Sequence, residues 1–233
     1  MISTSSLIND CIFDFIYGMA MADATRRTKC ATSQKALLNK TDYWKAKRAR
    51  QLVKGYANRV VSKRKPCDFY KTAREVENSL NTINKCFSFG NTQKLINMTM
   101  KYIYIAYYFN LDLGSCYIDN DAPMDDCMRD FVYRSWFHLG LDKTCCKKPG
   151  FYISHPWSTL DSIKGKNEYK AFQIAINEII KAKKITRDGK SINRIEFDYL
   201  FWDKARRLIG KSMKEQKTIT RDIWETFDSE NQH

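Results

Sequence analysis

The chain has 233 residues, of which 43% are hydrophobic and 13% aromatic, and its formal net charge is +14. This supply of apolar residues suffices for one core or for two small lobes, and the scarcity of glycine and proline argues against long irregular stretches. No apolar run approaches the roughly 20 residues that a membrane span needs. The acidic N-terminal stretch reads as an amphipathic helix rather than as a signal peptide.

The spacing of apolar residues predicts an almost wholly helical chain. In chain order, the expected helices are Leu7–Ala22, Asp42–Val61, Lys71–Cys86, Thr92–Phe109, Asp125–Phe137, Glu168–Ala182 and about Glu196–Ile209. The first helix is expected to bury Ile8, Ile12, Phe15, Ile16 and Met19. One strand pair is expected at 149–155, and the segment 211–217 reads as exposed. The pattern predicts an all-α fold.

Positive charge is concentrated in one segment of the chain. Residues 26–65 contain 14 Lys and Arg against one acid, Asp42, a local charge of +13. Such a segment indicates a partner with dense negative charge, most often nucleic acid, whereas an anionic membrane surface or a merely solvated face is the alternative. We expect double-stranded DNA to bind along residues 42–65. The candidate contacts are Lys45, Lys47, Arg48, Arg50 and Lys54.

The eight cysteines include no C-x-x-C pair. A chain of this length has no need of disulfides, so we predict reduced thiols. A zinc site is an alternative, but the spacing of its candidate ligands matches no closed pattern. Those candidates are Cys127, Cys145, Cys146, His138 and His155. We expect no metal and no cofactor.

A polar turn at residues 88–92 is predicted to join two apolar segments and to lead into the helix Thr92–Phe109. Backbone N–H groups of Gly90, Asn91 and Thr92 are expected to face a phosphate, and Asn91 or Thr92 is expected to cap the helix. Lys94 then falls in the first turn, where the helix dipole disfavours a cation. Thirty-one residues later, Asp125 follows a proline at the start of the next helix.

This arrangement over residues 70–140 resembles the helix-hairpin-helix (HhH-GPD) superfamily of DNA glycosylases. The wide spacing from Lys94 to Asp125 is most similar to archaeal-type 8-oxoguanine DNA glycosylases, or to a phage-defence glycosylase of similar build. The chain departs from the family pattern at three points. The hairpin keeps one glycine, Gly90, where two are usual; Lys94 stands four positions after it; and no cysteine follows Cys146 to hold an iron–sulfur cluster.

The resemblance implies one helical glycosylase-like domain, residues 1–233, with a helix-hairpin-helix-like element. Its two helical lobes would be approximately 1–70 with the C-terminal helices, and 71–140, with a cleft between them near Lys94 and Asp125. It also implies an enzyme that excises a modified base from DNA, with or without AP-lyase activity.

In this resemblance, Lys94 is the nucleophile that attacks C1′ of the sugar, and Asp125 stabilises the developing positive charge. The site at a helix start favours the neutral amine that such an attack requires. The plainer alternatives are that Lys94 extends to solvent or to a phosphate and that Asp125 only caps its helix. Asp126 and Asp119 are rival carboxylates, and Lys101 is a second candidate amine.

A flipped-out base needs a stacking face and polar groups that read its edge. Gln93 and Asn97 lie one helical turn apart, and either can offer donors and acceptors to a base. Trp157 is the expected pocket wall. Trp136 and Trp202 are further candidates, although tryptophans at such positions are more often core residues.

The main alternative function is a non-catalytic DNA- or RNA-binding protein that uses the basic helix 42–65. A helical ribonuclease is disfavoured because the chain has only three histidines, at 138, 155 and 233, and no matching signature. We expect a monomer in the cytoplasm, associated with the nucleoid, or in a nucleus.

Overall fold

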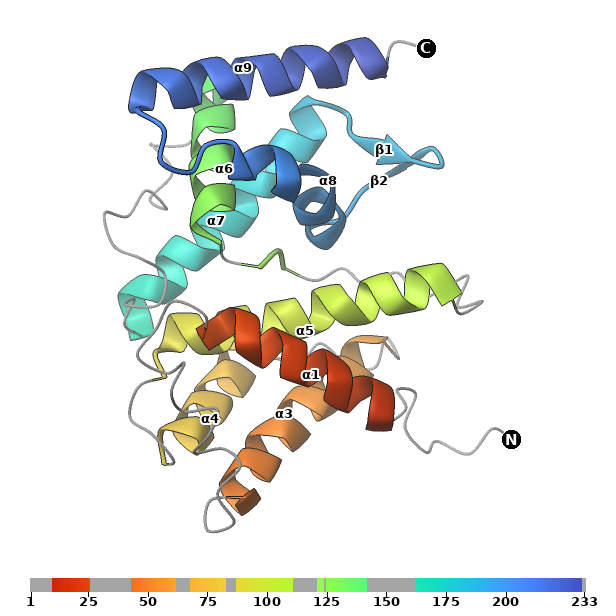
Figure 1. Cartoon of the computed structure of the whole chain (residues 1–233), viewed down its shortest axis with the longest axis vertical. Helices are drawn as coiled ribbons and strands as arrows, with labels where there is room; N and C mark the ends of the chain where they lie inside the picture. The colour runs from red at the N-terminus through yellow and green to blue at the C-terminus, as the bar shows by residue number, and fades with distance from the viewer. Residues whose placement is uncertain are drawn as a thin grey trace. The chain divides into compact units, whose positions relative to one another are not determined.

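A computed structural model describes residues 10–25, 43–61, 68–82, 87–110, 121–123, 125–141 and 162–231 (Figure 1). These ranges form eight helices and one short hairpin, so the prediction of a mostly helical protein is confirmed. The helices are α1 (Asp10–Thr25), α3 (Tyr43–Val61), α4 (Phe69–Asn81), α5 (Phe89–Asn110), α6 (Asp126–His138), α7 (Ser162–Ala182), α8 (Arg194–Arg206) and α9 (Met213–Glu230). The hairpin pairs β1 (Thr186–Arg187) antiparallel with β2 (Lys190–Ser191). The strand pair expected at 149–155 lies outside the described residues.

None of the helices in these ranges combines the length and the hydrophobicity that crossing a bilayer demands. The chain divides into two compact units. Unit 1 comprises Met1–Pro123 and Trp157–Ser162, and unit 2 comprises Met124–Pro156 and Ile163–His233. The division falls at Pro123 rather than near residue 70, because α4 and α5 pack with α1 and α3. The cleft expected between two lobes stays a prediction.

In unit 1, α1 packs against α5, and α4 packs against both α3 and α5. Ion pairs join α1 to α3. Asp10 Oδ1 lies 3.0 Å from Arg50 Nη2 and 2.5 Å from Lys54 Nζ. Asp14 also pairs with Arg50. Hydrogen bonds from Lys54 and Arg50 lower the pKa of Asp10. The acidic residues of α1 thus neutralise part of the basic segment within the fold.

The face that α1 buries differs from the expected one. Phe15 and Ile12, predicted to be inside, are 70% and 47% exposed, whereas Phe13 is fully buried. Phe13 lies three residues after Asp10, so the two share a helix face, and Asp14 lies one turn after Asp10. Arg50 lies over the Phe13 ring at 5.3 Å. The ion pairs with α3 therefore lie beside the buried face of α1, which packs against α5. Ile16 is buried as expected, Met19 is exposed, and Ile8 lies outside the described residues.

In unit 2, α6 packs against α8 and α9 (Figure 1). Aromatic side chains of the three helices stack on one another. The ring centroid of Phe131 lies 5.4 Å from that of Phe201 and 5.6 Å from that of Trp224. Trp224 also donates a hydrogen bond from Nε1 to Ser135 Oγ at 2.9 Å, which satisfies its polar atom inside the core. This cluster fixes α6, and with it Asp125, on the C-terminal helices.

Candidate functional site

The start of α5 differs from the predicted turn. The helix begins at Phe89, and Ser88 caps it: Ser88 Oγ accepts the Asn91 N–H at 3.2 Å, and the Ser88 carbonyl accepts the Thr92 N–H at 3.1 Å. Residues 89–92 are therefore the first helical turn rather than a hairpin. The expectation that Asn91 or Thr92 caps the helix is wrong, because Ser88 stands in the position where its hydroxyl can do so.

The earlier start of α5 changes the surroundings of Gly90, Asn91 and Thr92, the residues expected to contact a phosphate. Gly90, Asn91 and Thr92 are all buried, and the Asn91 side chain donates to the carbonyl of Ala24 in α1 at 3.2 Å. Asn91 thus helps to dock α5 onto α1, and a phosphate contact at these three residues stays a prediction. Lys94 is half-buried and is the sixth residue of α5, so it lies beyond the first turn. Because the dipole effect falls off within that turn, it no longer gives a reason for a neutral amine at Lys94.

A row of buried polar side chains runs along α5. Gln93, Asn97 and Lys101 follow one another at intervals of four residues, so they share one face of the helix. Gln93 and Asn97 are 0% exposed, and Lys101 is 8% exposed. Asn97 Nδ2 donates to the carbonyl of Ala122 at 3.3 Å. We call Gln93, Asn97 and Lys101 the α5 polar row.

Gln93 is the unusual member of the α5 polar row. Both its Nε2 and its Oε1 are buried, and neither has a hydrogen-bond partner among the described residues. Each buried polar group left without a partner costs roughly 1–3 kcal/mol, and native folds contain few of them. Gln93 and Asn97, one helical turn apart in the sequence, do lie on one buried face of α5.

Asp125 holds the N-cap position of α6, yet its side chain makes no capping hydrogen bond. Instead, Asp125 Oδ2 accepts a hydrogen bond from Trp202 Nε1 of α8 at 3.2 Å. The rival carboxylate, Asp126, lies 3.4 Å from Arg129 within its own helix. The local contacts therefore favour Asp125 as the carboxylate positioned by a second element.

The three tryptophans proposed as pocket walls differ in position. Trp136 is a core residue at 3% exposure, and Trp202 is half-buried against Asp125. Trp157 and Asp119 lie outside the described residues. The contact from Trp202 to Asp125 joins residues 77 positions apart, and no sequence signal pointed to it.

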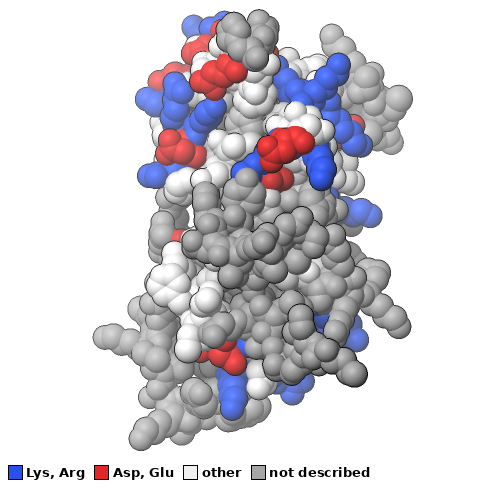
Figure 2. Space-filling model, turned by 90° about the vertical axis from the view of Figure 1, so that its right-hand side faces the viewer, with Lys and Arg blue, Asp and Glu red and all other residues white. Residues whose placement is uncertain are grey.

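The basic helix α3 has two kinds of cation. Lys47 and Arg48 are exposed, whereas Arg50 and Lys54 form the ion pairs with α1, and the side chain of Lys45 lies outside the described residues. Pairing with carboxylates makes Arg50 and Lys54 less available to phosphates than Lys47 and Arg48, and their contact with DNA stays a prediction. On the face of unit 2 drawn in Figure 2, the described Lys and Arg side chains are interspersed with Asp and Glu. Among described residues, α3 is thus the stronger candidate for DNA contact.

Replacing Lys47 and Arg48 together by glutamine is expected to weaken DNA binding without regard to sequence. Each phosphate contact contributes about 0.9 to the slope of log K against log salt, so the slope should fall by about 2. Fluorescence anisotropy with a labelled duplex at several salt concentrations measures it. The matched control is Lys71→Gln with Lys170→Gln, two exposed lysines on α4 and α7. Equal slopes for both double variants would remove α3 from the interface.

Zinc ligation finds no support in the described ranges, where no three His, Cys, Asp or Glu side chains gather as a metal site needs. Cys145, Cys146 and His155 lie outside those ranges. Burial, and then the charges of Asp125 and Asp198, raise the pKa of Cys127 to about 12. A thiol in that environment resists forming the thiolate that zinc binds.

Comparisons with protein-family models, with curated proteins and with solved structures find no match.

The roles proposed for individual residues therefore rest on chemistry and local geometry. Two features carry the most weight: the α5 polar row with its buried Gln93, and the Asp125 carboxylate held by Trp202.

Proposed function

We propose that this protein is a DNA glycosylase that excises a modified base from double-stranded DNA. Lys94 acts as the amine nucleophile, Asp125 as the carboxylate, and Gln93 with Asn97 reads the edge of the flipped-out base. The observation that carries the proposal is Gln93, a fully buried amide with no hydrogen-bond partner among the described residues.

The energetic argument is that an apolar side chain in place of Gln93 would serve the core better. An amide that no described residue satisfies, at roughly 1–3 kcal/mol for each polar group, is expected where function needs it. Because Gln93 is shielded from solvent in the unliganded protein, base reading requires that the groups covering it move when DNA binds. Glutamine suits this task, since its amide presents both a donor and an acceptor to a base edge.

The chemistry follows from the bond that breaks. As the bond between the base and C1′ lengthens, the sugar gains positive charge, and the Asp125 carboxylate stabilises that charge. The amine of Lys94 attacks C1′, and the base leaves with the bonding electron pair and takes up the proton that the newly bonded nitrogen loses. The resulting aminal opens to a Schiff base, from which β-elimination cleaves the strand. The hydrogen bond from Trp202 orients Asp125 for this role.

The test is a screen of duplexes, each with one modified base at a defined position, assayed for base release and for strand cleavage. The proposal predicts release from at least one member of the panel. Lesion-free duplex is the control. If all duplexes bind but none loses a base, the protein is instead a non-catalytic DNA-binding module that uses the exposed Lys47 and Arg48 of α3.

Replacing Gln93 by methionine separates function from packing. Methionine has nearly the same shape and no polar atoms to satisfy, so the free energy of unfolding is expected to rise by about 1–3 kcal/mol. Base release is expected to fall, because the base edge loses its partner. Chemical denaturation and single-turnover excision measure the two effects, with Thr99→Val on the same helix as the control for a buried polar-to-apolar change. Full activity in Gln93→Met would show that Gln93 does not recognise the flipped-out base.

A further inference from the structure

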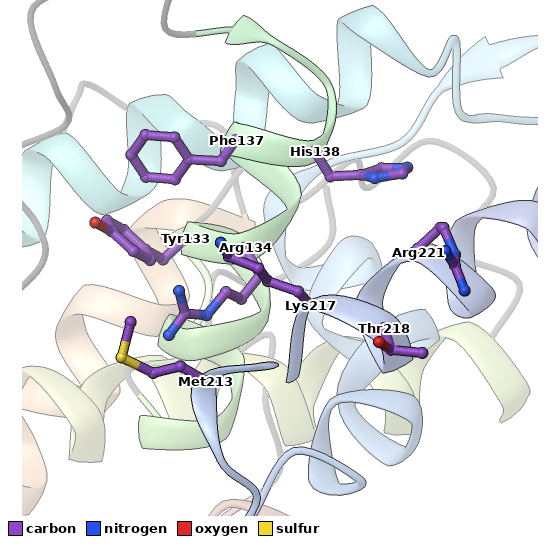
Figure 3. Close-up of a pocket in the computed structure, with 8 residues that line it drawn as sticks. All are labelled: Tyr133, Arg134, Phe137, His138, Met213, Lys217, Thr218 and Arg221. Atoms are coloured by element: carbon purple, nitrogen blue, oxygen red, sulfur yellow. The ribbon is translucent and has the colours of Figure 1, made fainter. Parts of the chain in front are cut away.

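A second polar site lies within unit 2, between α6 and α9. A pocket of about 570 Å³ opens there, within the range of small-molecule sites. Figure 3 shows its lining side chains entering from the two helices. From α6 come Tyr133, Arg134, Phe137 and His138, and from α9 come Met213, Lys217, Thr218 and Arg221. Three cations and a histidine line this pocket, and none of its described lining residues is a carboxylate.

Arg134 is the decisive residue, because it is buried to 9% exposure at the pocket wall. No carboxylate lies within ion-pair distance of it among the described residues, and its only hydrogen-bond partner there is the neutral Oε1 of Gln216, at 3.2 Å. A guanidinium has five N–H donors, and a buried charge without a counter-charge is costly. Arg134 therefore needs an anion that the described part of the chain does not provide.

The side chains that contact Arg134 are Gln216 and Tyr133, and Gln216 is fixed by further hydrogen bonds. Gln216 donates from Nε2 to the carbonyls of Leu208 and Lys211, at 3.4 and 3.3 Å, which points its Oε1 at the guanidinium. The ring of Tyr133 lies 5.4 Å from the Arg134 guanidinium carbon. A cation oriented in this way before a ligand arrives is suited to planar, two-point recognition of a phosphate.

The other cations differ in their availability. Lys217 is exposed and forms no ion pair with any described residue, so its ammonium can turn toward an anion at Arg134. Arg221 is partly engaged, 3.3 Å from Asp222 and 3.6 Å from Glu225. Burial, followed by the charge of Lys183, lowers the pKa of His138. A neutral His138 still offers one N–H donor.

The pocket also offers a surface for a flat ring. The rings of Tyr133 and Phe137 are 4.8 Å apart at 68°, an edge-to-face pair, and both are half-buried. In Figure 3 they lie on one side of the pocket and His138 and Arg221 lie on the other. An aromatic surface next to a phosphate-binding arginine matches the two parts of a nucleotide, its base and its phosphate.

We propose that this pocket binds a nucleotide through a phosphomonoester held by Arg134 and Lys217, with the base against Tyr133 and Phe137. This site uses none of the residues assigned to base excision, so either proposal can fail without the other. The same chemistry belongs to a free nucleoside monophosphate and to the 5′-phosphorylated end of a DNA strand.

Calorimetric titration of the full chain with dAMP tests the proposal, with deoxyadenosine and inorganic phosphate as the partial probes. We expect dAMP to bind at least tenfold more tightly than either part alone. Lys217→Gln should weaken dAMP binding by about tenfold, as loss of a hydrogen bond to a charged group does. Lys214→Gln, an exposed lysine on the same helix outside the pocket, should leave it unchanged.

Arg134→Lys is the second variant, and it keeps the charge while removing the planar fork. Its affinity for dAMP should also fall by about tenfold or more, with circular dichroism as the check on folding. A 5′-phosphorylated trinucleotide that competes with dAMP assigns the site to strand ends, and one that does not compete assigns it to free nucleotides. Absence of dAMP binding, or equal affinities in Lys217→Gln and Lys214→Gln, would overturn the proposal.

Discussion

Replacing Lys94 by glutamine is expected to abolish the covalent adduct that borohydride traps between this protein and DNA with an abasic site. Only a primary amine forms the Schiff base that borohydride reduces, and glutamine has none. DNA binding should change only by about the strength of one exposed ion pair, 0–1 kcal/mol, so chemistry and binding should separate. Denaturing gel electrophoresis of the reduced complex measures the adduct, and anisotropy measures the affinity.

Lys101→Gln is the matched comparison, since this residue is the other lysine of α5. The adduct should persist in Lys101→Gln and be absent from Lys94→Gln. The reverse result would assign the nucleophile to Lys101, the last member of the α5 polar row. An adduct that survives in both variants would place the amine elsewhere in the chain and would end the assignment of Lys94.

Replacing Asp125 by asparagine is expected to slow base excision by about 10²–10³, the usual cost of losing one electrostatic partner of the transition state. The change removes the charge but keeps an oxygen that can accept the Trp202 Nε1–H. Asparagine is also a favoured N-cap residue, so α6 should start at the same place. Single-turnover base release measures the rate, and thermal unfolding verifies the fold.

Asp126→Asn provides the control, because Asp126 is the adjacent carboxylate and lies 3.4 Å from Arg129. Its loss should affect excision far less than the loss of Asp125. If Asp126→Asn is the slower enzyme, the two carboxylates exchange roles. If both variants excise at the parent rate, neither carboxylate takes part in excision. That result would favour the alternative of a non-catalytic DNA-binding protein.

Helix periodicity predicted most helices of the fold, and its errors have physical causes. The apolar residues of α1 occupy more than one face, so the pattern alone could not choose the buried one. That choice depends on how α1 packs against α5, and the partners of Asp10, Arg50 and Lys54, lie 40 and 44 residues away along the chain. The segment 211–217 was correctly read as exposed. Helix α9 was missed, although Ser212 and Glu215 form the capping box that marks a helix start in a sequence.

The candidate site was predictable to the extent that it depends on spacing along one helix. Gln93 and Asn97 share a face because they are one turn apart, which any sequence reading of a helix provides. The contact of Asp125 with Trp202 and the pocket around Arg134 depend on how α6 packs against α8 and α9. Tertiary packing of that kind has no periodic signal, so the structure was needed to find both.

The hydrogen bond between Trp202 and Asp125 has an optical consequence. The indole of Trp202 lies between the Asp125 carboxylate, which its Nε1 contacts, and the guanidinium of Arg206, whose central carbon is 4.9 Å from the ring centroid. Charges of opposite sign on two sides of an indole set the energy of its emission. The difference spectrum between the parent protein and Trp202→Phe isolates that emission from the other tryptophans. The emission of Trp202 is therefore expected to report, without any label, when a ligand displaces or neutralises the carboxylate beside it.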